Sequence, residues 1–208
     1  MQSRTIEIGN NELIINQNLD YGYAGEVWDA ALVLSYFLIN PKSQSVINPK
    51  DKIILELGSG TGIIGLITGF LGAKKIILTD KGGCTKLISE NYETNKKILP
   101  SHLECIVKEV DWLKEDYKKI SDEVDYIIGS DLVWKNELIK PLSDIIKYFM
   151  ERNNNCIAVF SFQIRDEKIK TFFDMFPKKE YKIEKLPDQY YDDEYKADDI
   201  IIIRILKN

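Results

Sequence analysis

The chain of 208 residues carries 28 Lys and Arg against 33 Asp and Glu, so its net charge is −5 at pH 7. The length suits a single domain, 1–208, and the acidic balance excludes the broad basic surface of a nucleic-acid-binding protein. No apolar run approaches the roughly 18 residues of a membrane-spanning helix, and no secretory signal pattern opens the sequence. We therefore expect a cytoplasmic or nuclear protein.

Three cysteines and one histidine limit the chemistry of the chain. Cys84, Cys105 and Cys156 form no C-x-x-C pair, so we expect reduced, packed thiols and no metal site. A Ser-His-Asp relay or a multi-histidine metal centre is hard to build with His102 alone. His102 itself suits a surface position at the start of a strand.

The first fifty residues contain one strong helix signal. The N-terminal segment, 1–26, holds a short apolar run, Leu13–Ile15, and a glycine-rich turn at Gly22–Gly25. Val27–Leu38 is almost wholly apolar and lacks Gly and Pro, which predicts a buried helix. Two prolines and many polar residues predict a loop over Asn40–Asp51.

From residue 53 onward, short apolar runs alternate with segments of helical length. Such alternation predicts a parallel sheet covered by helices on both faces. The predicted strands are Ile53–Leu57, Lys75–Thr79, Leu103–Val110, Val124–Gly129 and Asn155–Phe162. The predicted helices are Gly62–Leu71, Thr85–Lys96, Pro141–Met150 (with the proline in the first turn) and Asp166–Phe176.

The C-terminal part breaks this alternation. Glu180–Leu186 and Ile200–Leu206 have the pattern of strands and are joined by a polar loop with no helix between them. A parallel pair needs a crossover of about a dozen residues or more, usually a helix, so these two strands should pair antiparallel. The predicted fold is α/β, with a mostly parallel seven-stranded sheet and a C-terminal antiparallel hairpin.

A glycine-rich turn follows the first predicted strand. The segment Glu56–Gly62 has the sequence E-L-G-S-G-T-G. Glycines let the backbone turn sharply and approach a ligand where a Cβ would collide. Asp80 ends the next strand, 20 residues after Gly60, where a carboxylate can accept both ribose hydroxyls of an adenosine group. The turn and the carboxylate together predict a nucleotide-type cofactor.

The glycines alone do not identify that cofactor. Gly60–Gly65 also satisfies G-x-G-x-x-G, the pattern of dinucleotide-binding proteins, and a glycine turn can also serve only to pack a helix on a strand. Glu56, two residues before Gly58, gives the E-x-G-x-G-x-G form that resembles motif I of methyltransferases. A dehydrogenase would also need a substrate and hydride site, for which little chain remains.

Four segments carry a wider resemblance. Gly25–Leu34, which contains V-W-D-A-A, together with Leu55–Gly62, Thr79–Asp80 and Ser130–Trp134, resembles the motifs of methyltransferase family 16, a family of class I protein-lysine methyltransferases. The resemblance implies a Rossmann-like fold, S-adenosyl-L-methionine as cofactor and a lysine of a protein as methyl acceptor. We also expect the N-terminal segment, 1–26, to pack on or cap the cofactor site.

The resemblance assigns cofactor contacts to the first half of the chain. Trp28 would lie against the methionine end of the cofactor, although an apolar helix also offers it a core position. The backbone of Gly58, Ser59 and Gly60 would contact the cofactor, and Asp80 would hold the ribose. By the same resemblance, Glu56 would organise the turn and, often through water, the methionine amino group.

The second half of the chain completes the implied site. Trp112 would flank the adenine, with Asp111 beside it, and Ser130 would line the cofactor pocket. Asp131 would orient the target amine; its alternative role is that of a strand-end carboxylate that caps nearby amides. Trp134 departs from the family motif D-x-x-Y/F, so a hydroxyl is not essential there, while a π face for a cationic amine is retained.

The C-terminal section resembles one branch of the family. Leu186–Pro187, Asp193–Tyr195 and Asp198–Ile200 are similar to the members that act on valosin-containing protein, the p97 ATPase. The loop 188–199 holds six acids and three tyrosines in twelve residues. This composition suits either recruitment of a basic stretch of a protein substrate to the mouth of the pocket or a solvated hairpin loop.

Two other functions remain open. A small-molecule N- or O-methyltransferase shares the fold, since function depends on the site. A non-catalytic module could keep the cofactor only to stabilise a partner. The V-W-D-A-A box and Ser130–Trp134 favour the protein-lysine enzyme. We expect a monomer that acts on a protein substrate, with no nucleic-acid or membrane partner.

Overall fold

A seven-stranded sheet forms the centre of the molecule, for which the computed structural model describes residues 2–208. Its strands are β3 (Ile53–Leu57), β4 (Lys75–Asp80), β5 (Glu104–Glu109), β6 (Tyr126–Ser130), β7 (Ile157–Gln163), β8 (Tyr181–Lys185) and β9 (Ile200–Lys207). The strand order is β5-β4-β3-β6-β7-β9-β8. The pairs from β5 to β7 are parallel, whereas β9 is antiparallel to both of its neighbours.

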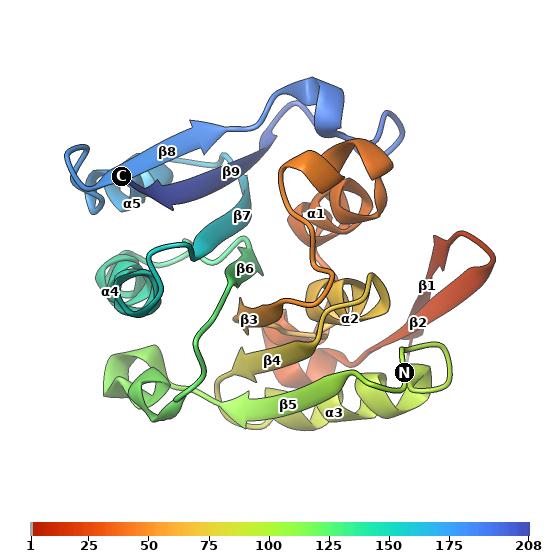
Figure 1. Ribbon diagram of the computed structural model, residues 1–208. Coiled ribbons are helices and arrows are strands. Elements are labelled where there is room, and N and C mark those ends of the chain that lie inside the picture. The colour runs from red at the N-terminus through yellow and green to blue at the C-terminus, as the bar shows by residue number, and fades with distance from the viewer. Residues whose placement is uncertain (1) are drawn as a thin grey trace.

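Helices cover both faces of this sheet. The helices are α1 (Asp29–Ile39), α2 (Ile63–Phe70), α3 (Cys84–Asn95), α4 (Asn136–Arg152) and α5 (Lys168–Asp174). Helices α1, α2 and α3 lie on one face, and α4 and α5 lie on the other (Figure 1). The predicted α/β fold, its mostly parallel seven-stranded sheet and its C-terminal antiparallel hairpin are confirmed.

The central strands are apolar because both of their faces are buried. In β3, Ile54 belongs to the apolar cluster under α1, α2 and α3, while Leu55 and Leu57 belong to the cluster under α4 and α5. All three side chains are fully buried. A strand between two helix layers has no solvent face, so it lacks the alternation of a half-buried strand.

Helix α4 corrects one prediction from the sequence. It begins at Asn136, so Pro141 lies inside the helix and not in its first turn. The missing N–H of the proline leaves the carbonyl of Glu137 without its helical donor, but Glu137 is exposed and water can supply one. Burial of Ile139 and Leu142 on the sheet side favours the helix across the proline.

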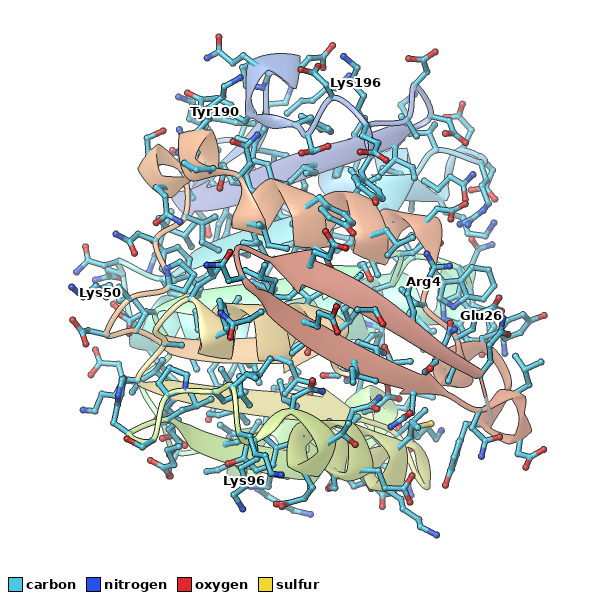
Figure 2. All side chains as sticks on the ribbon, turned by 90° about the vertical axis from the view of Figure 1, so that its right-hand side faces the viewer. Arg4, Glu26, Lys50, Lys96, Tyr190 and Lys196 are labelled. Atoms are coloured by element: carbon cyan, nitrogen blue, oxygen red, sulfur yellow. The ribbon has the colours of Figure 1, made fainter. Side chains whose placement is uncertain are left out.

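A two-stranded hairpin precedes the central sheet and was not predicted. It consists of β1 (Gln2–Ile8) and β2 (Asn11–Gln17), which pair antiparallel, and it lies across the helix layer between α1 and α3 (Figure 2). One face is apolar and buried. The buried residues of that face are Ile6, Ile8, Leu13 and Ile15.

Side chains of α3 bond to the free edge of β2. Asn95 accepts from the Ile14 N–H at 2.8 Å and donates to the Ile14 carbonyl at 2.7 Å. Asn91 does the same for Asn16, at 2.8 and 3.0 Å. Two asparagines one helical turn apart therefore satisfy alternate residues of the strand, as a third strand would.

Short 3₁₀ segments connect the larger elements. They are η1 (Leu19–Gly25), η2 (Pro41–Ser45, within the predicted loop), η3 (Trp112–Lys114), η4 (Asp116–Lys119) and η5 (Asp188–Tyr190). The cysteines are free thiols, and burial raises the pKa of Cys105 and of Cys156 to about 12. His102 is exposed in the turn before β5. Between residues 2 and 208, no helix has the length and apolar character needed to cross a membrane.

Candidate active site

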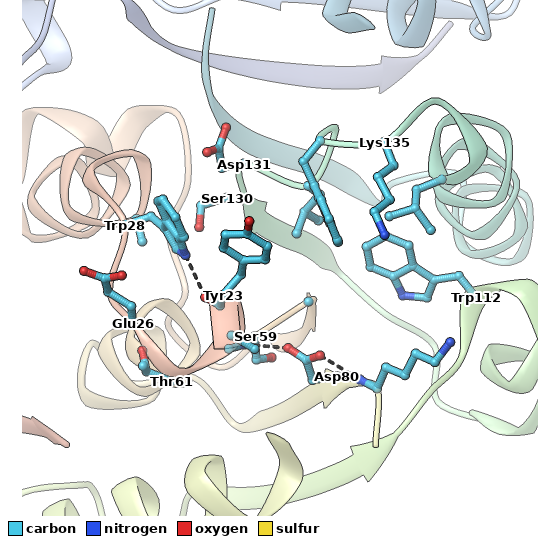
Figure 3. A pocket seen from close by; sticks show the side chains of 18 of the residues that line it. Tyr23, Glu26, Trp28, Ser59, Thr61, Asp80, Trp112, Ser130, Asp131 and Lys135 are labelled. Carbon is cyan, nitrogen blue, oxygen red and sulfur yellow. Dashed lines mark hydrogen bonds between the residues drawn. The ribbon is translucent and has the colours of Figure 1, made fainter. Parts of the chain in front are cut away.

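A cavity of about 620 Å³ opens at the carboxyl ends of β3, β4 and β6, where parallel α/β sheets place their ligand sites (Figure 3). Of the site residues predicted from the sequence, all except Glu56 line this cavity. The lining residues among them are Trp28, Gly58, Ser59, Gly60, Asp80, Asp111, Trp112, Ser130, Asp131 and Trp134. Segments from both halves of the chain therefore meet at one place.

The glycine turn between β3 and α2 is held against β4. The Ser59 N–H donates to the Thr79 carbonyl at 2.9 Å, and the Thr79 N–H donates to Ser59 Oγ at 3.0 Å. Gly58 has φ 58°, in the left-handed region, and a Cβ on it would lie 2.6 Å from Leu132 Cδ2. A side chain at this position would therefore be strained and would collide with the loop that follows β6.

Asp80 at the end of β4 ties this turn to the cavity wall. One carboxylate oxygen accepts from the Gly60 N–H at 2.7 Å, and the other accepts from the Lys81 N–H at 2.7 Å (Figure 3). Burial raises the pKa of the Asp80 carboxyl, while these two backbone bonds oppose the rise. The result is a fixed acceptor beside the turn, suited to ligand hydroxyls.

Glu56 lies beneath the turn instead of in the cavity wall. It is 1% exposed, and its Oε2 accepts from the Gly65 N–H in the first turn of α2 at 3.1 Å. Burial raises the pKa of the Glu56 carboxyl to about 8, against the opposing effect of its bonds to Ser59 and Gly65. Its contacts are those of a residue that organises the loop.

The wall after β5 supplies a flat aromatic surface. Trp112 is half-buried and lies on the opposite side of the cavity from Trp28 (Figure 3). Asp111 is buried, accepts from the Leu113 N–H at 3.1 Å and pairs with Lys81 Nζ at 3.1 Å. The Asp111 side chain thus caps η3 and fixes the position from which Trp112 projects.

The cavity wall before α1 contains Trp28, which the sequence predicted, and Tyr23, which it did not. Trp28 immediately precedes α1 and lines the cavity, so it does not occupy a helix core position. Its Nε1–H donates to the Tyr23 carbonyl at 2.8 Å. The Tyr23 ring lies between two tryptophans, 5.8 Å from Trp28 and 5.6 Å from Trp134 between centroids. The only sequence signal for Tyr23 was its place just before the V-W-D-A-A box.

The loop after β6 carries the predicted acceptor-side residues. Ser130 ends β6, and Asp131 has φ 54° with its N–H bonded to the Ser161 carbonyl at 2.8 Å. Trp134 is 48% exposed, and the Nζ of Lys135 lies 4.3 Å from the centroid of its ring. The Trp134 face therefore already accommodates an ammonium group from the chain itself.

A second residue missed by sequence reasoning is Arg165, in the loop between β7 and α5. Its Nη1 donates to Asp131 Oδ2 at 2.6 Å, and its side chain lines the cavity. Its other terminal nitrogen bonds to Gln163 Oε1. No sequence motif pointed to it, because the contact depends on β7 lying next to β6.

The acidic loop 188–199 lies over α1, and none of its described residues lines the cavity. Tyr195 stacks on Tyr36 of α1 with ring centroids 3.5 Å apart. Burial and the bond to Tyr195 raise the pKa of Tyr36. Residues 2–208 also hold no cluster of three or more potential metal ligands.

Comparisons with known proteins point to one family. A family model described as lysine methyltransferase matches residues 7–179. The chain is 28% identical to Protein N-lysine methyltransferase METTL21A of Mus musculus over 201 residues, which covers 93% of this chain and 86% of the relative. It is 31% identical to Protein-lysine methyltransferase METTL21E of Mus musculus over 169 residues, 80% of this chain and 66% of the relative.

A solved structure shares the fold. SMU.776 complexed with SAH (S-adenosylhomocysteine) is similar with a TM-score of 0.60 and 15% sequence identity, covering 99% of this chain and 56% of that chain. At this identity the similarity concerns the fold alone.

Proposed function

The chain belongs to the lysine methyltransferase family, and we propose that it transfers the methyl group of S-adenosylmethionine to the side-chain amine of a lysine in a protein substrate. One observation carries this proposal: the cavity joins an aromatic wall to a fixed carboxylate, Asp131. An aliphatic stem that ends in an amine suits such a wall. The METTL21A and METTL21E relatives, which are named as lysine methyltransferases, support the same acceptor.

The cavity residues fit S-adenosylmethionine. A Cβ on Gly60 would lie 3.1 Å from the Ala24 carbonyl oxygen, so the turn forms a narrow backbone cradle that a side chain would fill. The Asp80 carboxylate suits ribose hydroxyls, and the Trp112 face beside Asp111 suits an adenine. We assign the methionine end to the Trp28 and Ser130 side of the cavity. When bound, the cofactor supplies an electrophilic methyl group on a sulfonium.

The protein would act mainly by orienting and deprotonating the acceptor amine. A free lysine has a pKa of about 10.4, roughly 3.4 units above pH 7, so removing its proton at pH 7 costs about 4.6 kcal/mol of free energy. Burial of the amine against Tyr23 and Trp134 lowers that cost because desolvation disfavours the ammonium. Asp131 would accept a hydrogen bond from the neutral amine and aim its lone pair in line with the transferred methyl group.

A label-transfer assay separates this function from the two alternatives. The purified protein is incubated with eukaryotic cell lysate and labelled S-adenosylmethionine, and we expect label in a protein band, with the methyl group located on lysine by mass spectrometry. Asp131→Ala should bind SAH like the unmodified protein but lose about 100-fold or more in labelling, because the acceptor amine is no longer positioned. Glu123→Ala removes an exposed carboxylate in the segment before β6, outside the cavity and outside the acidic loop 188–199, and should label normally.

Other outcomes would identify the alternatives. Label confined to the small-molecule fraction would indicate a small-molecule methyltransferase. A protein that binds SAH but labels nothing would indicate a non-catalytic binding module. Normal labelling by Asp131→Ala would contradict the role given to Asp131.

We propose a p97-type ATPase as the first protein substrate to test. The resemblance of Leu186–Pro187 and Asp193–Tyr195 to the family members that act on p97 supports this choice. Purified p97-type ATPase should gain methyl groups on one lysine when it is incubated with this enzyme and S-adenosylmethionine. If the ATPase stays unlabelled while a different lysate protein gains label on lysine, that protein replaces the ATPase as the proposed substrate. The lysine methyltransferase function would then stand.

A further inference from the structure

The Asp131 carboxylate is held by bonds to both of its oxygens. Oδ2 accepts from Arg165 Nη1 at 2.6 Å, and Oδ1 accepts from the Gln163 N–H at 3.3 Å. The Asp131 side chain is 15% exposed, and its backbone is fixed by the bond to Ser161. The orientation of this carboxylate is therefore set from the neighbouring strand β7.

The guanidinium of Arg165 is itself fixed from two sides. One terminal nitrogen donates to Asp131 and the other to Gln163 Oε1. Gln163 Nε2 in turn donates to Asp199 Oδ2 at 2.7 Å, just before β9. This chain of bonds keeps a positive charge against Asp131, although the Arg165 side chain is 46% exposed. A guanidinium does not lose its proton in the working pH range of proteins.

Other charged groups surround the place where the acceptor amine would lie. They come from η1 and the residue after it, from the carboxyl ends of β4, β5, β6 and β7 or the loops that follow them, from α4, and from the residue before β9. The charged or titratable residues that line the cavity, or that bond to its wall through Gln163, are Tyr23, Glu26, Asp80, Lys81, Asp111, Asp131, Lys135, Glu137, Arg165 and Asp199. Among them, Arg165 is the cation bonded to the Asp131 carboxylate.

A lone carboxylate beside the amine would oppose the proposed reaction. An opposite charge within about 4–6 Å favours the charged form of a titratable group, typically by 1–3 pH units. Asp131 alone would therefore stabilise the ammonium form of the substrate lysine, which cannot attack a methyl group. A second cation bonded to the same carboxylate offsets that effect, because it repels the ammonium and leaves the neutral amine unaffected.

We propose that Arg165 is a positioning residue that offsets the charge of Asp131, so that Asp131 orients the substrate amine without retaining its proton. The inference rests on the proposed lysine methylation. It assigns a reaction-specific role to an ion pair that would otherwise count as a partly exposed contact of small energetic value. It also explains why one carboxylate can serve an acceptor that must be neutral when it reacts.

The pH dependence of kcat tests this role. The substrate is the protein identified by the label-transfer assay, and rates are measured from pH 6 to pH 10. For Arg165→Gln we expect the acid limb of the kcat profile to move up by about one pH unit or more. At pH 7, kcat then falls about ten-fold or more without a rise in KM, and the two profiles converge at high pH. Arg165→Lys keeps the charge and should return the limb to within about 0.3 pH unit, by the same reasoning.

A control and a binding measurement complete the design. Lys168 lies three residues after Arg165. Lys168→Gln removes a cation that pairs with Asp166, and its profile should match that of the unmodified protein. SAH affinity of Arg165→Gln, measured by calorimetry, should stay within two-fold. A kcat that falls equally at every pH in Arg165→Gln, or a profile that does not change, would overturn the inference. Absence of lysine labelling by the unmodified protein would instead overturn the proposed function, and this inference with it.

Discussion

At the scale of single residues, Glu56 shows how a motif residue can act from beneath the glycine turn. Its motif predicted that Glu56 organises the turn and reaches the methionine amino group, often through water; the carboxyl group is buried under the turn and bonds to Gly65. Burial without a cationic partner favours the protonated acid. Glu56 therefore links the stability of the turn to pH.

We predict that the Glu56→Gln variant is less sensitive to pH than the unmodified protein. The folded-state pKa of Glu56, about 8, lies above its ordinary value of 4.5, so the folded protein binds more protons than the unfolded chain between these values. Stability contributed by the protonated acid is complete below pH 4.5 and is lost as the pH rises through 8. Glutamine keeps an oxygen for the Gly65 N–H and removes the titration.

Urea unfolding of the ligand-free protein at pH 5 and pH 8.5 measures this effect. Relative to the unmodified protein, Glu56→Gln should gain stability between the two pH values, on the order of a few kcal/mol. Glu123→Gln serves as the control, because Glu123 is exposed in the segment before β6. Parallel losses of stability in all three proteins would show that Glu56 is not the titrating group.

Local spacing was enough to predict part of the site and not the rest. The Gly58–Gly62 turn and Asp80 belong to one strand–turn–helix–strand unit, so the contact between them depends on geometry that is local in the sequence. Arg165 reaches Asp131 across 34 residues, and only the pairing of β7 with β6 brings them together. Tyr23 likewise depends on the path of η1 over the cavity, which no repeating pattern encodes.

At the scale of elements, the N-terminal hairpin depends on a helix for its edge. In Leu13–Ile15 the middle residue is partly exposed, while Leu13 and Ile15 are buried. Because all three residues are apolar, the sequence lacks the alternation of polar and apolar residues that predicts a half-buried strand. The backbone of Ile14 finds its partners in the Asn95 side chain. The sequence shows the asparagines but not that their helix lies beside the strand.

We predict that Asn95→Ala lowers the free energy of unfolding by about 1–3 kcal/mol, since it leaves the Ile14 N–H and carbonyl without these partners. Urea denaturation measures the loss, and hydrogen exchange at Ile14 should accelerate. Thr94→Ala is the matched control on the same helix, because Thr94 accepts one exposed bond from Asn16. Its cost should stay below about 0.5 kcal/mol. Equal costs for the two variants would contradict this role of Asn95.

At the scale of the whole molecule, the cavity joins segments that pack on both faces of the sheet. One apolar cluster lies under α1, α2 and α3, the other under α4 and α5, and strands between them contribute to both. The alternation of short apolar runs with segments of helical length predicted the sheet and its two helix layers, because most of the parallel strands are followed by a helix that packs on one face of the sheet. A ligand that contacts loops from both layers stabilises the entire fold.

We predict that SAH raises the melting temperature. At a free concentration of 100 times its Kd, the stabilisation is about 2.7 kcal/mol. For a domain of this size, that corresponds to a shift of roughly 5–11 °C, measured by differential scanning fluorimetry. The Gly58→Ala variant should respond weakly, because a Cβ there meets Leu132 at 2.6 Å. A shift with NADH and none with SAH would instead favour the dinucleotide alternative.

The place of β9 in the sheet has a consequence for how the protein is made. β9 follows β8 along the chain but lies between β7 and β8, with Ser161 of β7 paired to Ile202. During synthesis on the ribosome, every earlier strand emerges while the edge of β7 still lacks its neighbour. β8 cannot dock until β9 arrives between them. The nascent chain therefore carries an open strand edge on β7 until β9 has been synthesised and inserted, and an open edge of this kind can pair with another chain.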